Sequence, residues 1–440
     1  MKMPTTSQLP IFQAANAPIV QYPNLHFIKY MGSKREIIEW VGSEIESTLG
    51  RESGTVLDLM AGTGGVGYAL APRHRIISND IQAYSTVLAR ALLQTTADVP
   101  HADSVWTILV PYFEQNRKTL AKTLKTHLLL EAKFINQLAI TWDVVRNYRE
   151  FQNQYPHAGN FQHSEIFNGL GTKFQRLIAS RKENPAGFPY CLFTAYFANA
   201  YFGLQQAIDI DSLRYALDCV MPEGTELRSL ALSCLMHAAS YCTPGPGHFA
   251  QFRALNSLPV CEDILRYRGR SVRDYFLKKW DEFRDRFRRP MHDNTCETLD
   301  YGDALANYVS DADLVYADPP YSFVHYSRFY HALETLVRYD YPGSEFYGRY
   351  RTDRHQSPFC VKVQVKDAFL RIIEPTAANK KKLVLSYSNT GMIDIGDLRT
   401  LCEHSFRQVQ VKTNSYLHAT MGRRGDKTRK VKEALVICQP

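Results

Sequence analysis

Short apolar runs separated by helical patterns dominate the first hundred residues of the chain. Residues 55–60 and 75–78 have the length and apolar character of buried strands, and residues 66–70 and 83–93 fit helices that follow them. An amphipathic helix is expected before these runs, at 34–49. This order of helix, strand, helix, strand and helix predicts a doubly wound α/β fold with a parallel sheet.

The alternation of strands and helices stops near residue 100 and resumes after about 200 residues. Short runs rich in Val, Leu and Ile predict four further strands, at 313–317, 382–386, 408–411 and 434–438. The intervening block contains helical periodicities, aromatic clusters and turn-forming segments. We therefore expect residues 1–100 and 301–440 to form one α/β domain, and residues 101–300 to form an inserted, mainly helical domain.

The composition argues against several classes of protein. With 45% hydrophobic and 22% charged residues, the chain can bury a normal core. It contains no run of roughly 18 apolar residues, and its N-terminus lacks a basic region followed by an apolar one, so we expect neither a membrane span nor a secretion signal. Nine cysteines without a Cys-x-x-Cys pair argue against a disulfide framework and a structural metal site. We expect a cytoplasmic protein without a bound metal.

The formal net charge of +8 favours a nucleic-acid partner only weakly. The distribution of charge is more informative, because basic residues cluster near the C-terminus. Six of them lie between Met421 and Lys432, against one acid: Arg423, Arg424, Lys427, Arg429, Lys430 and Lys432. Such a run is compatible with a solvated loop and, equally, with a segment that contacts phosphates.

Acidic residues and glycines lie where the first two strands end. Asp58 precedes the turn that contains Gly62 and Gly64, and glycine lets a backbone approach a bound cofactor closely. Asp80 ends the next strand, where a carboxylate can accept hydrogen bonds from the ribose hydroxyls of an adenosine. The turn has an acid before it and no Lys-Ser/Thr after it, so it suits a cationic sulfonium better than phosphates. An ordinary tight turn is the alternative interpretation.

The sequence Asp318-Pro319-Pro320-Tyr321 follows a predicted strand directly. Its prolines fix the backbone and remove two N–H donors, so the local carbonyls stay free to accept hydrogen bonds. If Asp318 and the Pro319 carbonyl each accept one N–H of an exocyclic amine, the nitrogen lone pair can attack a methyl sulfonium. Tyr321 can stack on a base that has left the duplex. Taken alone, the tetrapeptide also fits a rigid surface turn.

With these motifs the chain resembles the Dam-like adenine-N6 DNA methyltransferases, in the pattern of the FokI-type restriction-system methylases. Residues 318–321 resemble the catalytic signature of the family, and residues 326–335 resemble the continuation found in the FokI-type enzymes. Asp303, shortly before the catalytic strand, resembles the acid that bonds the adenine amino group of the cofactor. The resemblance implies a Rossmann-like methyltransferase domain and covers most of the chain.

Two further blocks carry the resemblance. Residues 27–34 are similar to the family's N-terminal cofactor motif, which implies cofactor contacts for Lys29, Tyr30 and Lys34. The turn from Asp58 to Gly64 resembles the family's glycine-rich cofactor loop, with Met60 where phenylalanine is usual. Asp80 matches the acid that binds the ribose.

The resemblance implies transfer of a methyl group from S-adenosylmethionine to a flipped-out adenine in double-stranded DNA. It makes the insert a target-recognition domain, the basic C-terminal run a phosphate contact, and a cognate restriction endonuclease a candidate partner. A cytosine-N4 or RNA methyltransferase on the same fold is an alternative, although the aspartate of the tetrapeptide favours adenine. A DNA-binding protein that has lost turnover is another alternative.

One aromatic stripe in the predicted insert has two interpretations. Phe276, Trp280, Phe283 and Phe287 recur at helical spacing in a segment rich in arginine. A stripe of this kind is more often part of a hydrophobic core than a surface on which bases stack. We therefore expect these rings to be buried.

Overall fold

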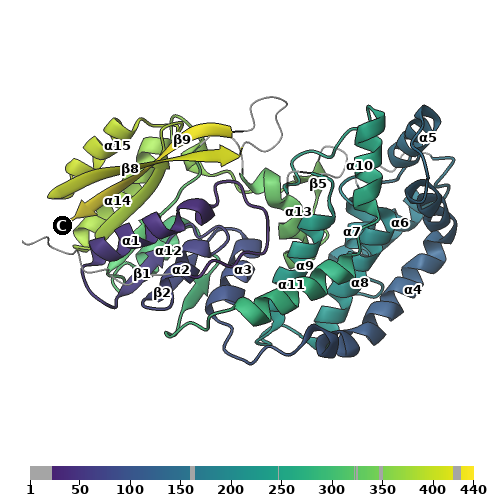
Figure 1. The fold of residues 1–440 in the computed structure, drawn as a ribbon, viewed down its shortest axis with the longest axis horizontal. Helices are drawn as coiled ribbons and strands as arrows, with labels where there is room; N and C mark the ends of the chain where they lie inside the picture. The colour runs from purple at the N-terminus through teal and green to yellow at the C-terminus, as the bar shows by residue number, and fades with distance from the viewer. Residues whose placement is uncertain are drawn as a thin grey trace, which may run out of the picture.

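The computed structural model describes residues 22–158, 164–245, 247–321, 323, 326–345, 350–419 and 428–440. Two regions lie side by side along the long axis of the molecule (Figure 1). We call them the sheet half, formed by the central sheet and the helices on its two faces, and the helical half, formed by helices α4 to α11. Helix α13 (Tyr326–Arg338) packs against helices of both regions.

A seven-stranded sheet with the order β3-β2-β1-β4-β7-β9-β8 forms the centre of the sheet half. The strands from β3 to β7 are parallel, and β9 runs antiparallel to both of its neighbours. The strands are β1 (Thr55–Asp58), β2 (Arg75–Asn79), β3 (Thr295–Glu297), β4 (Leu314–Ala317), β7 (Lys382–Ser388), β8 (Gln408–Ala419) and β9 (Thr428–Gln439). The protein is therefore a mixed α/β protein with a mainly parallel sheet.

Helices cover both faces of the sheet, and alternate strand residues therefore enter two different cores. Val56 of β1 belongs to the core under α1, α2 and α3, whereas its neighbour Leu57 belongs to the core under α12, α14 and α15. These helices are α1 (Ile38–Leu49), α2 (Gly65–Leu70), α3 (Ala83–Leu93), α12 (Tyr301–Tyr308), α14 (Val365–Ala378) and α15 (Ile395–Glu403). Short turns of 3-10 helix occur at η1 (Lys34–Ile37) and η2 (Pro358–Cys360).

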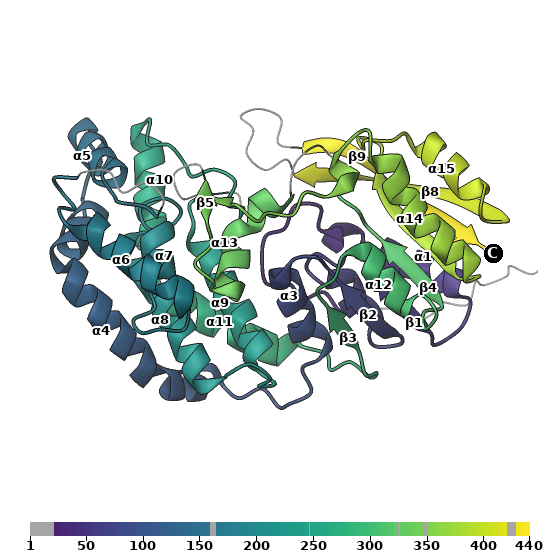
Figure 2. The ribbon, with the colours of Figure 1, turned by 180° about the vertical axis from the view of Figure 1, so that it is seen from behind.

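The helical half is built almost entirely from the segment between β2 and β3 (Figure 2). Its helices are α4 (Ala102–Ile135), α5 (Trp142–Asn153), α6 (Leu170–Glu183), α7 (Leu192–Tyr196), α8 (Leu204–Val220), α9 (Arg228–Cys242), α10 (Leu258–Arg268) and α11 (Val272–Arg286). A two-stranded ribbon, β5 (Ser344–Glu345) with β6 (Tyr350–Arg351), follows α13.

The two halves share one hydrophobic core. The core under α1 to α3 continues without a break into the helices of the helical half. Polar contacts also join the halves through the segment after β4. The Tyr339 hydroxyl donates to Asp211 on α8 over 2.5 Å, and Arg214 on α8 donates to the Leu336 carbonyl over 3.1 Å. The helical half is therefore inserted in sequence but continuous with the sheet half in its packing.

The expected α/β fold with a mainly parallel sheet is confirmed, with local differences. The sequence missed β3, whose three residues are too short a run to show periodicity. The expected helix at 34–49 begins with the 3-10 turn η1, and the α-helix starts at Ile38. Strands β8 and β9 have 12 residues each, longer than expected, because they pair with each other along their full length. Phe276, Trp280 and Phe283 are buried, as predicted, whereas Phe287 is only partly buried and packs against the same core.

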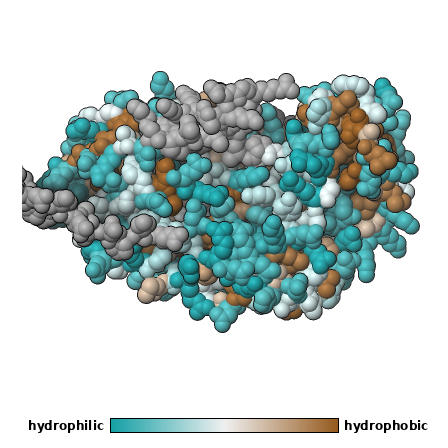
Figure 3. All heavy atoms as spheres, in the orientation of Figure 1, coloured by the Kyte–Doolittle hydropathy of each residue, from teal (hydrophilic) through white to brown (hydrophobic). Residues whose placement is uncertain are grey.

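The surface is mainly hydrophilic on the face drawn in Figure 3, with hydrophobic side chains gathered at the outer end of the helical half. Exposed large hydrophobic residues in or next to α4 and α5 include Leu129, Leu138 and Trp142. Within the described ranges, no helix has the length and apolar character needed to cross a membrane.

Candidate active site

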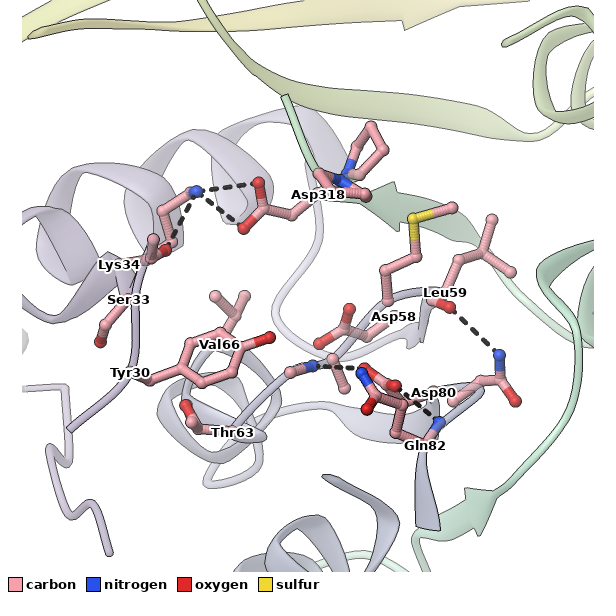
Figure 4. Close-up of a pocket in the computed structure, with 18 of the residues that line it drawn as sticks. Tyr30, Ser33, Lys34, Asp58, Leu59, Thr63, Val66, Asp80, Gln82 and Asp318 are labelled. Carbon is pink, nitrogen blue, oxygen red and sulfur yellow. Dashed lines mark hydrogen bonds and ion pairs between the residues drawn. The ribbon is translucent and has the colours of Figure 1, made fainter. Parts of the chain in front are cut away.

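Three strands of the sheet end at one cavity, and each contributes an acid to its wall. Asp58 is the last residue of β1, Asp80 follows β2, and Asp318 follows β4. All three line the same cavity, together with residues 30–35 of the segment that leads into α1. The carboxyl ends of parallel strands meet at one edge of a sheet, which is where α/β proteins bind their ligands. Figure 4 shows Asp58 between Tyr30 and Asp318.

The glycine-rich turn after β1 is held in place by Asp80. The Gly62 N–H donates to one carboxylate oxygen of Asp80 and the Gln82 N–H to the other, both over 2.9 Å. Gly62 has a φ of +56°, and a Cβ at this position would lie 3.1 Å from a ring carbon of Tyr30. Burial raises the pKa of Asp80 to about 6, although these backbone hydrogen bonds oppose the shift. The turn, Asp80 and Tyr30 therefore form one wall of the cavity.

Asp58 is a buried carboxylate that faces the cavity without a partner. Its exposed fraction is 1%, and no side chain among the described residues donates a hydrogen bond to either of its oxygens. Burial, followed by repulsion from Asp318 and Asp80, raises the pKa of Asp58 to about 8. A buried acceptor of this kind is costly unless a donor or a cation reaches it. The site is therefore suited to a ligand with a positively charged group.

Asp318 lies in a dense network of charges and hydrogen bonds. The Lys34 ammonium lies 2.8 Å from one carboxylate oxygen of Asp318 and 2.7 Å from the other. The same ammonium bonds to the Tyr321 hydroxyl, which in turn donates to Asp318 over 2.7 Å. Burial raises the pKa of Asp318, and the Lys34 charge opposes this shift. Asp318 thus has a cation and a hydroxyl as partners, whereas Asp58 has neither.

Glu433 of β9 completes this network from the opposite side. Its side chain is fully buried, and one oxygen lies 3.4 Å from the Lys34 ammonium. The same oxygen accepts a hydrogen bond from the Ser386 hydroxyl over 2.7 Å and lies 2.7 Å from the Tyr321 hydroxyl, whose single proton Glu433 shares with Asp318. Neither Glu433 nor Ser386 was predicted to belong to the site. The only sequence signal was an acid within an otherwise basic and apolar strand.

Most residues predicted for the site line the cavity. Besides the three acids, the cavity wall contains the following: Tyr30, Lys34, Met60, Gly62, Pro319, Pro320 and Tyr321. The Tyr30 ring also stacks on Tyr330 with centroids 4.9 Å apart. The Tyr321 ring packs edge-on against Tyr387 at 5.4 Å, with its hydroxyl toward Lys34.

Three of the residues predicted to bind the cofactor lie outside the cavity wall. The Lys29 ammonium lies 4.7 Å from the centre of the Tyr241 ring, on α9. Gly64 faces α3, and a Cβ there would lie 3.0 Å from the Ala89 Cα, so this glycine allows the helix to pack closely. Asp303 lies in the first turn of α12.

Asp300, three residues before Asp303, lines the cavity. It is the N-cap residue of α12, and its carboxylate accepts a hydrogen bond from the Gly302 N–H over 2.9 Å. An aspartate immediately before an apolar helical pattern was the available signal. The two residues are about one helical turn apart, and the sequence alone did not show which of them lines the cavity.

Glu334, in the continuation that follows the tetrapeptide, has a structural role. Its carboxylate accepts hydrogen bonds from the N–H groups of Ala83 and Tyr84, over 3.3 and 3.1 Å. These are free N–H groups at the start of α3, which a carboxylate from α13 satisfies. The contact therefore ties the segment after Asp318 to the helix that follows Asp80.

The predicted DNA-binding residues lie in or next to the hairpin of β8 and β9. Arg423, Arg424 and Lys427 lie outside the described residues. Arg429 and Lys430 belong to β9, and their side chains lie outside the description. The ends of β8 and β9 at Ala419 and Thr428 point toward the helical half in Figures 1 and 2. In the part of the chain that the structure describes, no group of three or more His, Cys, Asp or Glu side chains could hold a metal ion.

Comparison with known proteins places the chain in a family. The model for D12 class N6 adenine-specific DNA methyltransferases matches residues 30–139 and 268–401. The chain is 24% identical over 383 residues to the type II methyltransferase M.FokI of Planomicrobium okeanokoites, covering 83% of the chain and 45% of the relative. It is 23% identical over 400 residues to the modification methylase LlaI of Lactococcus lactis subsp. lactis, covering 88% and 51% respectively.

A shorter match links the chain to the type II methyltransferase M.NlaIII of Neisseria lactamica, with 30% identity over 104 residues, or 23% of the chain and 29% of that relative. The chain spans about half the length of the first two relatives. No solved structure matches it. Because the two stretches that the family model matches make up more than half of the chain, the protein belongs to the D12 class of N6 adenine-specific DNA methyltransferases.

Proposed function

We propose that the protein is a site-specific DNA methyltransferase that methylates the N6 amino group of adenine and uses S-adenosylmethionine. Membership of the D12 class supports the reaction type. The observation that carries the proposal is the convergence of Asp58, Asp80 and Asp318 on one cavity at the carboxyl ends of the parallel strands. Asp58 and Asp80 would bind a cationic cofactor, and Asp318 beside them would bind an amino group.

The residues on the β1 and β2 side fit the cofactor. The unpartnered carboxylate of Asp58 is available for a cationic group, and the partly exposed carboxylate of Asp80 is available for ribose hydroxyls. Tyr30, Met60 and Gly62 would enclose the ligand between them. When bound, S-adenosylmethionine supplies an electrophilic methyl group. The contribution of the protein is to exclude water and to orient this group toward Asp318.

The residues on the β4 side fit the target base. Asp318 and the Pro319 carbonyl would each accept one N–H of the adenine amino group, which localises the lone pair on nitrogen. The nitrogen would then form its bond to the methyl group as the methyl–sulfur bond breaks, without prior loss of a proton, and the excess proton would afterwards leave the methylated amino group to Asp318. Tyr321 would contact the base, which must leave the duplex to reach the cavity. The network of Lys34 and Glu433 around Asp318 keeps the carboxylate in a fixed orientation.

Double-stranded DNA is the proposed substrate, and the helical half is the proposed target-recognition region. Residues 140–267, which lie between the two stretches matched by the family model, span most of α5 to α10. Side chains from this region would read base edges, while basic residues at the end of the β8–β9 hairpin would contact phosphates. A cognate restriction endonuclease is a candidate partner, because M.FokI and LlaI are named as a type II methyltransferase and a modification methylase.

A methyl-incorporation assay tests the proposal. The protein is incubated with labelled S-adenosylmethionine and unmethylated duplex DNA, and the nucleosides are then separated by mass spectrometry. We expect N6-methyladenine at one sequence motif. N4-methylcytosine would identify the cytosine enzyme, and methylation of RNA alone would identify an RNA enzyme. Cofactor-independent DNA binding with no incorporated methyl group would identify a silent DNA-binding protein.

A further inference from the structure

The Lys34 ammonium binds the carboxylate of Asp318, which in the proposed reaction accepts a hydrogen bond from the target amino group. It donates to both oxygens of Asp318, over 2.8 and 2.7 Å, and one of these oxygens also accepts from Tyr321. An ammonium and an exocyclic amine are both N–H donors, so they compete for the same lone pairs. One carboxylate oxygen of Asp318 already accepts two hydrogen bonds, so an N–H of the target base would share the other oxygen with Lys34 and weaken the contact of the ammonium with Asp318.

A second acid lies within reach of the same ammonium. The nearer oxygen of Glu433 is 3.4 Å from the Lys34 nitrogen. Its other oxygen is buried and has no hydrogen-bond partner among the described residues, although the side chain is fully enclosed. A buried carboxylate oxygen without a donor is stabilised by a cation that approaches it. A small shift of Lys34 would thus exchange its bond to Asp318 for a bond to Glu433.

The Tyr321 hydroxyl couples the two acids. It lies 2.7 Å from Asp318 and 2.7 Å from Glu433, yet it has only one proton to donate. Ser386 holds Glu433 from the β7 side over 2.7 Å. The position of Glu433 is therefore fixed relative to Asp318 by contacts that do not involve Lys34.

We propose that Glu433 is a positioning residue that receives the Lys34 ammonium when the target amino group binds to Asp318. This inference rests on the proposed function, because it requires Asp318 to bind an amino group. Glu433 does not touch the base or the cofactor. It acts through two neighbours. It offers Lys34 a second carboxylate when the ammonium leaves Asp318, and it holds the Tyr321 hydroxyl within hydrogen-bond distance of Asp318.

The charged groups around Asp318 determine how the proposal can be measured. Lys34 faces Asp318 from η1, Glu433 from β9, Asp58 from β1, and Tyr321 from the same loop. Lys34 lowers the pKa of Asp318 and Glu433 raises it, on top of the larger effect of burial. Substitution of Glu433 by glutamine removes one negative charge and retains the shape of the side chain. The pKa of Asp318 should therefore fall.

The first measurement follows Asp318 in the free protein and needs no turnover. The chain is labelled with ¹³C at the aspartate carboxyl, and the Asp318 resonance is assigned by its loss in Asp318→Asn. We expect this resonance to titrate at lower pH in Glu433→Gln. The matched control is Glu46→Gln, because Glu46 also accepts a tyrosine hydroxyl, that of Tyr22, over 2.7 Å, but lies outside the cavity wall. An unchanged titration in Glu433→Gln would overturn the proposed coupling.

The second measurement follows methyl transfer at saturating cofactor with varied duplex DNA. In Glu433→Gln, the negative charge that would receive the Lys34 ammonium is removed, so we expect the KM for DNA to rise about tenfold, the loss of one hydrogen bond to a charged group. The dissociation constant of the cofactor should stay as in the wild type, and the acid limb of the kcat profile should move to lower pH. Glu46→Gln should lower the melting temperature without changing the profile.

Failure of the inference is distinguishable from failure of the proposed function. A wild-type protein that transfers no methyl group contradicts the function, whatever the carboxyl titration shows. An active wild type with an unchanged KM in Glu433→Gln contradicts only the inference. If Glu433→Gln does not fold, Glu433→Asp keeps the charge but withdraws the carboxylate by one methylene, and a KM equal to that of the wild type would then overturn the proposal.

Discussion

The two sides of the cavity differ in how they treat a buried acid. On the β1 side, no described side chain donates a hydrogen bond to Asp58 or forms an ion pair with it, and its pKa is raised to about 8, although the Met60 N–H and the charge of Lys34 oppose the shift. On the β4 side, Asp318 has Lys34 and Tyr321 as partners. One side depends on a ligand to supply the missing charge, and the other is balanced by the chain itself. In the proposed function, this difference assigns the cationic cofactor to the β1 side and the neutral amino group to the β4 side.

The largest expected effect comes from removing Asp318, the acid on the β4 side of the cavity. Asp318→Ala removes an acceptor that the amino group needs in the transition state, so we expect methyl transfer to fall by about a thousandfold or more. Cofactor affinity should be retained, because Asp58 and Asp80 are intact. Single-turnover rates and calorimetric titration with the cofactor measure the two quantities. A variant that transfers methyl groups at full rate would contradict the assignment of Asp318.

Removing Lys34, the cation on the β4 side of the cavity, should destabilise the protein. Lys34→Met leaves Asp318 and Glu433 close together without a counter-ion, and we expect the free energy of unfolding to fall by about 3 kcal/mol. Urea denaturation measures this change. Lys279→Met is the matched control, because Lys279 is also buried and pairs with Glu282 over 3.2 Å, but is not part of the cavity wall. It should lose stability without affecting methyl transfer.

The β1 side should show the opposite response to neutralisation. The folded protein must either keep a proton on Asp58 or bury its charge, and asparagine needs neither, so we expect Asp58→Asn to make the empty protein more stable by about 1–3 kcal/mol at neutral pH and above. The sign follows from the raised pKa: the stability of the wild type is highest below the unfolded pKa of Asp58 and is lost as pH rises through about 8. Thermal unfolding of the wild type and of Asp58→Asn measures stability across this pH range. The expectation is contradicted if the stabilities of the two proteins depend on pH in the same way.

Cofactor binding on the β1 side should depend on pH through the same group. Below pH of about 8 the Asp58 carboxyl holds a proton that a cationic ligand must displace. As the pH is lowered from about 8 to about 7, we expect the affinity for the cofactor to fall by up to about tenfold per pH unit. Asp80 has a pKa of about 6 and therefore titrates below this range. Calorimetry on the wild type and Asp58→Asn tests this, since the variant should bind more weakly and without that dependence.

The smallest expected effect separates two glycines of the same turn. Gly62→Ala and Gly64→Ala each place a side chain at a positive φ and should cost about 1 kcal/mol of stability. Only Gly62→Ala should also weaken cofactor binding, because its Cβ displaces Tyr30 at the cavity wall. Gly64→Ala presses on α3 instead. Equal cofactor affinities in the two variants would remove the distinction between a cavity glycine and a packing glycine.

The sequence determined the features that are encoded locally. Apolar runs with the right lengths predicted β1, β2, β4 and β7, because periodicity and composition report burial along a short segment. The positions of Asp58, Asp80 and Asp318 at strand ends also follow from local order. Parallel strands bring such positions to one edge of the sheet, so their convergence could be expected before any coordinates were known.

Only the tertiary structure decided which partners these acids have. Lys34 and Asp318 are 284 residues apart, and Tyr321 and Glu433 are 112 apart, so no local pattern connects them. The same holds for β3 and for the core shared by the two halves, since both depend on packing between distant segments. Local propensities choose the elements and the residues at their ends. The contacts that set charge, pKa and orientation at the site arise only when those elements pack against one another.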